Sequence, residues 1–215
     1  EAIAAQVSSA LPKGPALQKI EQPVDPKAGE THIEFASKQT HLMLAQLGIE
    51  RNDPDFVALT LGNSVLGGGG FGSRLMTEVR EKRGLTYGVS SGFTPMQVPG
   101  PFMITLQTRA ELSENTLKLV QDIVRDFLIT GPTQKELDDA KRELSGSFPL
   151  STASNADIVG QLGAIGFYDL PLTYLEDFMQ QAQNVTVEQV KAAMNKHLSA
   201  DKMVIVTAGP TVPQK

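Results

Sequence analysis

Residues 66–93 read LGGGGFGSRLMTEVREKRGLTYGVSSGF, so a glycine run, a short helix and a strand follow one another closely. Four glycines in a row hold helical backbone poorly, and we expect Gly67–Gly70 to end a helix that begins near Pro54. A second helix is predicted over Ser73–Lys82, and Gly84 supplies its stop. The chain is therefore expected to reverse direction twice within this segment.

Helices and strands continue on both sides of this segment. Alternating apolar residues predict strands at Thr31–Ser37, Thr40–Leu47, Thr86–Thr94, Phe102–Thr108 and Met203–Thr207. Periodic apolar stripes predict helices at Ser113–Ile129, from Thr133 to Pro149, and at Ala156–Tyr168, Tyr174–Ala182 and Val187–Leu198. This order of elements predicts an α+β fold, in which helices cover a mixed or largely antiparallel sheet.

The composition is that of an ordinary globular protein. The chain has 215 residues, of which 40% are hydrophobic, and this suffices for a substantial core. A formal net charge of -5 disfavours electrostatic binding of nucleic acid or of an anionic membrane over a broad surface. The absence of cysteine excludes disulfides, thiol catalysis and cysteine-ligated metals.

Prolines gather in the first part of the chain, which shows little periodicity. We interpret residues 1–15 as a lead-in, and we expect a short strand at Ala16–Ile20. The domain itself is expected to span residues 16–209, with a tail at 210–215. The first residue is Glu1 and no signal-peptide pattern follows it, so we interpret the chain as part of a longer protein.

The glycine run formally satisfies the G-x-G-x-x-G pattern of dinucleotide-binding proteins at Gly67–Gly72. That fingerprint requires a strand before the glycines, whereas a helix is predicted there. A phosphate-binding loop requires Lys and then Ser or Thr after its last glycine, but Ser73 and Arg74 stand there instead. The glycines are therefore better interpreted as a tight connection between two helices.

The three histidines do not form a recognisable metal motif. His32, Glu34 and His41 lie on successive predicted strands and could meet, but catalytic zinc normally takes three protein ligands with H-x-x-E-H or H-E-x-x-H spacing. His197 lies near the end of a helix, where a positive charge complements the helix dipole. We expect no metal ligand in this chain, and its serines lack the G-x-S-x-G nucleophile pattern.

Arg80 and Tyr87 are the candidate functional residues of the glycine-rich segment. Arg80 lies at the edge of the inward stripe of its helix, and Tyr87 is predicted on the following strand, on the same face as Val89. A guanidinium and a phenol together can hydrogen-bond a peptide carbonyl or a developing oxyanion. The alternative is structural, with a buried core tyrosine and an arginine that pairs with Glu78 or Glu81.

Three segments resemble the C-terminal domain of M16 (pitrilysin/insulinase-type) zinc peptidases. They read LGNSVLGGGGFGSRLMTEVREKRGLTYGVSS, PGPFMITLQTR and GPTQKELDDAKRELSGSFPLSTASNADIVGQLG, and the similarity extends from Lys13 to Gly209. The R-E-x-x-G-L-x-Y pattern after a glycine-rich turn is highly specific in this context. The resemblance implies paired, related α+β domains around a chamber that admits unfolded peptides.

The resemblance also implies roles for individual residues. In this family zinc is held by an inverted H-x-x-E-H motif and a distal Glu in the other, N-terminal domain, which would be the partner of this chain. Arg80 and Tyr87 match the Arg–Tyr pair that in active members reaches the zinc site, binds the substrate backbone and stabilises the tetrahedral intermediate. Gly68, Gly69 and Gly70 are expected to contact the substrate peptide.

These implications describe the non-zinc half of a metalloendopeptidase, which has no cofactor of its own and works with zinc in the partner domain. Whether the chain alone is an enzyme stays open, because it carries no zinc-ligand motif. The alternative is a catalytically inactive structural or substrate-presenting subunit, as in other relatives of the family. The resemblance also favours the bacterial periplasm and allows a homodimer or a heterodimer.

Overall fold

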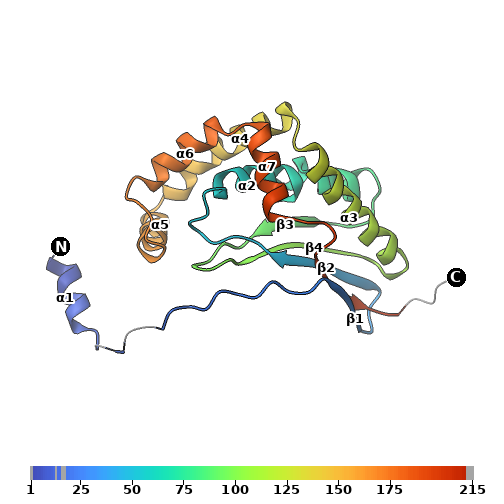
Figure 1. Ribbon diagram of the computed structural model, residues 1–215, viewed down its shortest axis with the longest axis horizontal. Helices are drawn as coiled ribbons and strands as arrows, with labels where there is room; N and C mark the ends of the chain where they lie inside the picture. The colour runs from blue at the N-terminus through green and yellow to red at the C-terminus, as the bar shows by residue number, and fades with distance from the viewer. Residues whose placement is uncertain (1, 13, 16–17, 212–215) are drawn as a thin grey trace.

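The centre of the molecule is a five-stranded sheet with the strand order β1-β5-β2-β4-β3 (Figure 1). The computed structural model describes residues 2–12, 14–15 and 18–211. The strands are β1 Gly29–Glu34, β2 Gln39–Leu47, β3 Val89–Phe93, β4 Pro101–Arg109 and β5 Val204–Gly209. β1 and β5 are parallel, whereas the other neighbouring pairs are antiparallel. The predicted α+β fold with a largely antiparallel sheet is confirmed.

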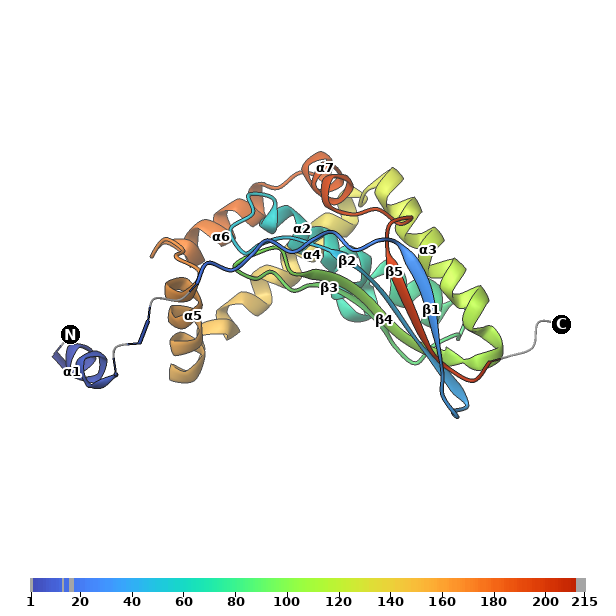
Figure 2. The same cartoon turned by 60° about the horizontal axis from the view of Figure 1, so that its bottom comes forward.

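Most of the helices lie on one face of this sheet. The α-helices are α1 Ala2–Ala10, α2 Phe56–Asn63, α3 Ser113–Thr130, α4 Gln134–Ser147, α5 Asn155–Phe167, α6 Tyr174–Asn184 and α7 Val187–His197. α5 lies at one end of the helical layer, and α1 stands apart from the rest of the chain (Figures 1 and 2). Over the described residues, the opposite face of the sheet carries no helix, and we call it the open face. None of the described helices is long and apolar enough to cross a membrane.

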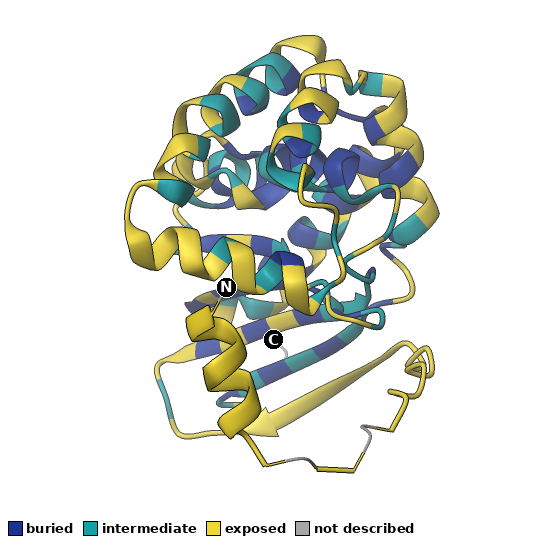
Figure 3. Cartoon of the chain, turned by 90° about the vertical axis from the view of Figure 1, so that its left-hand side faces the viewer, coloured by how far each residue is buried: buried dark blue, intermediate teal, exposed yellow. Residues whose placement is uncertain are grey.

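Strand alternation explains which side chains form the core. In β2, Leu42 and Leu44 are buried beneath the helices, whereas His41 and Met43 are exposed on the open face. The buried apolar side chains of β4 are Phe102, Ile104 and Leu106. Buried residues therefore gather between the sheet and the helical layer (Figure 3).

Capping boxes explain where two of the helices begin. The side chain of Thr133 accepts a hydrogen bond from the backbone N–H of Glu136, whose carboxylate accepts one from the backbone N–H of Thr133. Thr186 and Gln189 form the same reciprocal pair at the start of α7. Each box satisfies two backbone groups that a helix start would otherwise leave unpaired. The sequence prediction of both starts is confirmed.

The helix before the glycine run ends within Gly67–Gly70, as predicted, but its last turn is π-helical. α2 ends at Asn63, but the backbone continues as a π-helical turn over Ser64–Gly68. Gly67 is buried against the strand layer, where an added Cβ would lie 3.0 Å from the backbone nitrogen of Ser91. Close tertiary packing thus outweighs the poor helix propensity of glycine here.

The following helix and strand also differ from their predictions. The segment predicted as a helix at Ser73–Lys82 contains a π-helical turn over Met76–Glu81. The strand predicted from Thr86 begins only at Val89. Between them the chain turns at Gly84, which adopts a positive φ of 60° that suits glycine. The predicted stop at Gly84 is therefore confirmed.

The N-terminal part differs most from the sequence prediction. The predicted lead-in contains α1, and all residues of this helix are exposed. The strand predicted at Ala16–Ile20 includes residues 16 and 17, which lie outside the described residues, and Gln18–Ile20 belongs to no regular element. The first strand of the sheet begins at Gly29 instead.

Candidate functional site

Arg80 and Tyr87 come together at the surface, and Phe71 completes the group. The guanidinium carbon of Arg80 lies 5.5 Å from the ring centroid of Tyr87 and 4.6 Å from that of Phe71. These are cation–π distances, so the guanidinium group contacts both aromatic rings. Tyr87 is 91% exposed and Phe71 is 63% exposed. We call these three residues the arginine clamp.

Local hydrogen bonds explain why Tyr87 points outward. Thr86 Oγ1 donates to the carbonyl of Gly88 at 2.7 Å and accepts from the Gly88 N–H at 3.1 Å. In this turn the backbone groups of Gly88, just before β3, are hydrogen-bonded to the Thr86 side chain. Tyr87 therefore does not join the strand that was predicted to carry it. Thr108 Oγ1 donates to the carbonyl of Leu85 and fixes the approach to the turn. The alternative of a buried core tyrosine is wrong.

Of the two acidic residues expected as alternative partners of Arg80, Glu78 pairs with other cations, and no ion pair joins Arg80 to Glu81 among the described residues. The Glu78 carboxylate lies 2.6 Å from the Lys82 ammonium group and 2.6 Å from the Arg83 guanidinium group. Hydrogen bonds from these two cations lower the pKa of Glu78 below its ordinary value. Arg80 therefore contacts aromatic rings instead of the Glu78 carboxylate.

The glycine run Gly67–Gly70, which we call the glycine arm, packs closely against the preceding π-helical turn. A Cβ on Gly69 would lie 2.6 Å from the carbonyl oxygen of Ser64, and Gly70 has a positive φ of 57°. Asn63 ties this turn to β3, because its Oδ1 accepts from Ser91 Oγ at 2.7 Å and its Nδ2 donates to the Ser91 carbonyl at 3.1 Å. The arm thus requires glycine for both packing and backbone conformation.

The glycine run lines a hollow together with residues of the neighbouring strands, several of which lie on the open face. The hollow has a volume of about 520 Å³, and Gly67, Gly68 and Gly70 line it together with strand residues. The strand residues that line it are His41, Leu42, Met43, Val89, Ser90, Thr105, Leu106, Gln107, Val206 and Ala208. The described residues that line it include no Asp, Glu, Lys or Arg. Its chemistry suits an uncharged segment of polypeptide.

Arg74 anchors the arm from its C-terminal side. Its Nε and Nη2 atoms donate to the two carboxylate oxygens of Glu136 at 2.7 and 2.8 Å, and Nη2 also donates to the Gly131 carbonyl at 2.9 Å. Such a bidentate pair is geometrically specific. Hydrogen bonds from Arg74 lower the pKa of Glu136 from 4.5 to about 2. The start of α4 and the end of the glycine arm are thereby joined.

The structure separates His32 from His41, which lie on different faces of the sheet. β5 lies between β1 and β2, because a strand distant in sequence inserts there. His32 Nε2 lies 3.7 Å from Glu34 Oε2, and His32 Nδ1 lies 2.8 Å from Thr207 Oγ1. His41 instead lines the hollow beside the glycine arm. The possible meeting of these three side chains is therefore contradicted.

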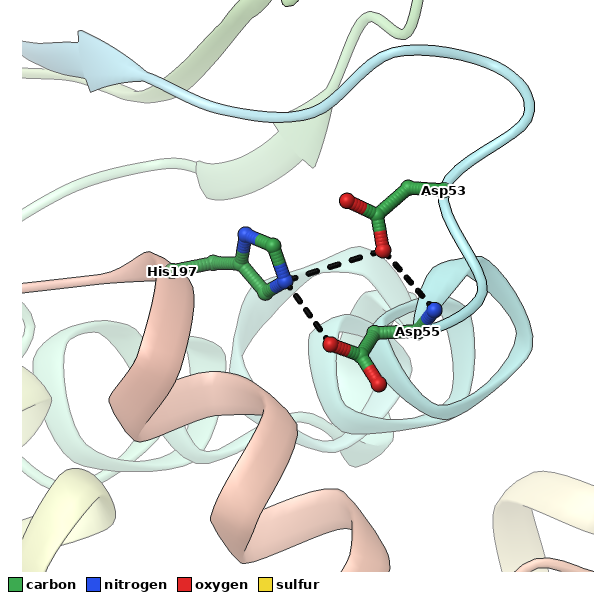
Figure 4. A group of neighbouring side chains, drawn as sticks. All are labelled: Asp53, Asp55 and His197. Atoms are coloured by element: carbon green, nitrogen blue, oxygen red, sulfur yellow. Dashed lines mark hydrogen bonds and ion pairs between the residues drawn. The ribbon is translucent and has the colours of Figure 1, made fainter.

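His197 contacts two carboxylates at the start of α2 (Figure 4). Its Nε2 atom lies 2.9 Å from Asp55 Oδ2 and 3.7 Å from Asp53 Oδ1. The Lys196 ammonium group lies 2.6 Å from the same Asp55 oxygen, and Asp53 Oδ1 already accepts from the Asp55 N–H at 2.8 Å. One histidine, two engaged aspartates and a competing ammonium group do not fit a catalytic zinc site.

Known proteins share the sequence pattern and the fold of this chain. The sequence profile of a protein family described as "Peptidase M16 inactive domain" matches residues 1–144. The chain belongs to this family. It is the M16 domain type that is described as inactive and that does not hold zinc. The resemblance inferred from the glycine-rich segment is thus confirmed.

Relatives agree with this assignment. A crystal structure of a peptidase M16 inactive domain from Pseudomonas fluorescens matches all of this chain and 51% of its own chain, with 78% identity and a TM-score of 0.95. An uncharacterized zinc protease of Streptomyces coelicolor is 29% identical over 87% of this chain and 43% of its own length. The "Non-peptidase homolog YmxG" of Helicobacter pylori is 33% identical over 60% of this chain and 30% of its own length. The chain thus spans less than half the length of these two curated relatives.

Phe71 is the site residue that the sequence analysis did not identify. Phe71 lies between Gly70 and Gly72, and nothing in that local pattern marked it as a partner of Arg80. Its contact with Arg80 depends on the turn at the glycine run. Only the three-dimensional arrangement shows that the two side chains meet.

Proposed function

We propose that this chain is the non-zinc half of an M16 metalloendopeptidase and supplies Arg80 and Tyr87 to the zinc site of its partner. The observation that carries the proposal is the arginine clamp, in which the Tyr87 phenol and the Arg80 guanidinium group are adjacent and the phenol is open to solvent. A buried tyrosine could not have served a site on another domain. The open face and the hollow would form part of the chamber wall.

In this proposal the two side chains act on the substrate backbone. Arg80 offers several N–H donors and Tyr87 offers one O–H donor, and both suit a peptide carbonyl or the oxyanion formed from it. Such donors accelerate a reaction most when they are held in place before the charge develops. Phe71 contributes by restricting the rotamers of Arg80 through its own cation–π contact.

The glycine arm and the hollow would bind an extended part of the peptide. Gly68 and Gly70 line the hollow without side chains, so a substrate backbone could approach them closely. Closure of the two halves would then bring the arginine clamp to the metal site. Because the zinc ligands would lie on one half and the Arg80 and Tyr87 donors on the other, hydrolysis would depend on domain closure.

The test uses the chain reconstituted with an M16 half that carries H-x-x-E-H. Tyr87→Phe should lower kcat/KM by roughly 10²–10³, the effect of losing one oxyanion donor. Tyr168→Phe, which removes a phenol from the end of α5, should leave the rate unchanged. Equal rates for the wild type and Tyr87→Phe would refute the assigned role.

A second function is favoured by one specific observation. The Helicobacter pylori relative is named a non-peptidase homolog, which is consistent with a domain that only presents substrate or supports a partner. In that case the reconstituted pair would bind an unfolded peptide without cleaving it, and Tyr87→Phe would not alter that binding. Measuring peptide binding and cleavage on the same sample separates the two functions.

A further inference from the structure

α5 presents an apolar surface that nothing in the described residues covers. Only Ile165 of this helix is buried. The exposed large apolar side chains of α5 have relative exposures from 40% to 68%, and they are Ile158, Val159, Leu162 and Phe167. Helices that are apolar around most of their circumference are normally buried in a protein. An uncovered surface of this kind marks an interaction site.

The exposed apolar side chains of α5 form one continuous surface. At about 100° per residue, Ile158, Leu162, Val159 and Phe167 fall within one half of the helix circumference. Asp157 falls outside that half, so no charged side chain of α5 interrupts it. We call this half of the helix the α5 face.

The helix is bonded to distant parts of the chain at its C-terminal end, and its N-terminal end is capped locally. Ser154 and Asp157 form a reciprocal capping box at its start. At its end, Asn52 Nδ2 donates to the Tyr168 carbonyl at 3.0 Å, and Gln97 Nε2 donates to the Phe167 carbonyl at 3.1 Å. These bonds connect α5 to two loops distant in sequence. The α5 face is therefore held ready for a partner, which lowers the entropy cost of binding.

The sequence around α5 is acidic, and the nearby cation Arg51 is engaged with the Phe56 and Tyr174 rings. Between Glu143 and Val190 the sequence contains six Asp or Glu residues and no Lys or Arg. Asp157 and Asp169 flank the two ends of α5, and Glu176 is exposed on the following helix. A second copy would bring like charges together, and an anionic membrane would be repelled. A partner with basic residues around an apolar centre fits this surface best.

We propose that the α5 face is the docking surface for the zinc-bearing M16 half, which would contribute an apolar patch rimmed by Lys or Arg. The identity of this partner rests on the proposed function. The Pseudomonas fluorescens chain, 78% identical where it matches, continues for about as much chain again, since the match covers 51% of it. That protein thus contains an additional segment of similar size, which is long enough to form a second domain.

Binding of the two halves tests this proposal without any need for cleavage. The H-x-x-E-H half is stripped of zinc with a chelator, and its affinity for the chain is measured by isothermal titration calorimetry. Leu162→Asp and Val159→Asp should each weaken binding by roughly tenfold or more, as expected for central interface positions. The control Ile129→Asp places the same charge on an exposed apolar residue at the end of α3 and should bind like the wild type.

The acidic rim is tested separately. Asp169 has a positive φ of 53°, a conformation that Asn also tolerates, so Asp169→Asn removes the charge and keeps the turn. This variant should reduce the dependence of the affinity on salt. Circular dichroism of each variant alone should match the wild type, because the substituted side chains are exposed. A variant that is unfolded would be replaced by Leu162→Gln.

Several results would overturn the proposal. An unchanged affinity of Leu162→Asp for the H-x-x-E-H half would do so. A wild-type dimer that Leu162→Asp dissociates would also do so, because a second copy of the chain would then occupy the α5 face. Flotation of the wild-type chain with phosphatidylserine vesicles, lost in Leu162→Asp, would identify a membrane instead. Cleavage that is insensitive to Tyr87→Phe, together with weakened binding of Leu162→Asp, would overturn only the proposed function.

Discussion

Replacing Glu136 by Gln should destabilise the chain in a manner that depends on pH. The Glu136 carboxylate receives two hydrogen bonds from Arg74 and further ones from the backbone N–H and the hydroxyl of Thr133. Gln cannot keep the charge, so the bidentate pair between the glycine arm and α4 is lost. The effect should appear as lower stability at neutral pH and should diminish in acid.

The size of the effect follows from the pKa of Glu136. A pKa lowered from 4.5 to about 2 corresponds to at most roughly 3 kcal/mol of folding free energy. The Glu136 side chain is 30% exposed, and solvent screening reduces this to about 1–2 kcal/mol. For a chain of this size, such a loss lowers Tm by roughly 3–6 °C.

The sign of the pH dependence is fixed by the direction of the pKa shift. Because folding lowers this pKa, the stabilisation is fully present above the ordinary value of 4.5 and is lost as the pH falls toward about 2. The free-energy difference between wild type and Glu136→Gln should therefore shrink by roughly half or more between pH 7 and pH 3.

Urea denaturation at these two pH values measures this difference. Glu143→Gln is the matched control, since it makes the same substitution on an exposed residue of α4 and should change stability little at either pH. A double-mutant cycle with Arg74→Met should assign most of the loss to the ion pair. A difference between wild type and Glu136→Gln that is equal at pH 7 and pH 3 would refute the electrostatic explanation.

Three further substitutions test the packing and capping. Gly69→Ala should destabilise the folded chain by about 1–3 kcal/mol, because the new Cβ would lie 2.6 Å from the Ser64 carbonyl oxygen. Thermal unfolding measures this loss. The control is Gly146→Ala, where an added Cβ would have no atom within 4 Å. Leu66→Ala should cost roughly 2–5 kcal/mol, since Leu66 is fully buried, and a loss below that range in urea titrations would mean that the core refills the cavity. Thr186→Ala should cost about 0.5–2 kcal/mol by removing the cap of α7, whereas Thr186→Ser should retain it in the same assay.

The parts of the fold that rest on local signals were predictable from the sequence. Thr133 and Thr186 each begin a helix at the predicted residue, because the cap and its partner are only three residues apart. β2 was predicted within one residue, since one of its faces is buried and the other open. In these elements, residues close in sequence carry the information that determines the structure.

The parts that rest on distant contacts were not predictable from one sequence. The insertion of β5 between β1 and β2 is decided by the pairing of Gly29–Glu34 with Val204–Gly209. No local pattern indicates which strands will be neighbours. The interpretation of His32, Glu34 and His41 as potential neighbours failed for this reason.

The candidate site was predictable only in part. Arg80 and Tyr87 were identified from their spacing after the glycine run, and the structure brings them together. The outward position of Tyr87 depends on the turn that Thr86 forms with Gly88. That turn replaces strand pairing, and the alternation of apolar residues gave no sign of it.

The departures from the local rules concentrate in the segment that contains the arginine clamp. Between Ser64 and Gly88, two helical stretches widen into π-helical turns and the predicted strand starts late. Single π-helical turns cost stability and are frequent at functional sites. A sequence selected only for stability would be expected to form regular helices and strands here, like the regular helices α4 and α7 of this chain. The irregular backbone instead places Phe71, Arg80 and Tyr87 at the surface, which is the result expected if this segment serves a partner's site.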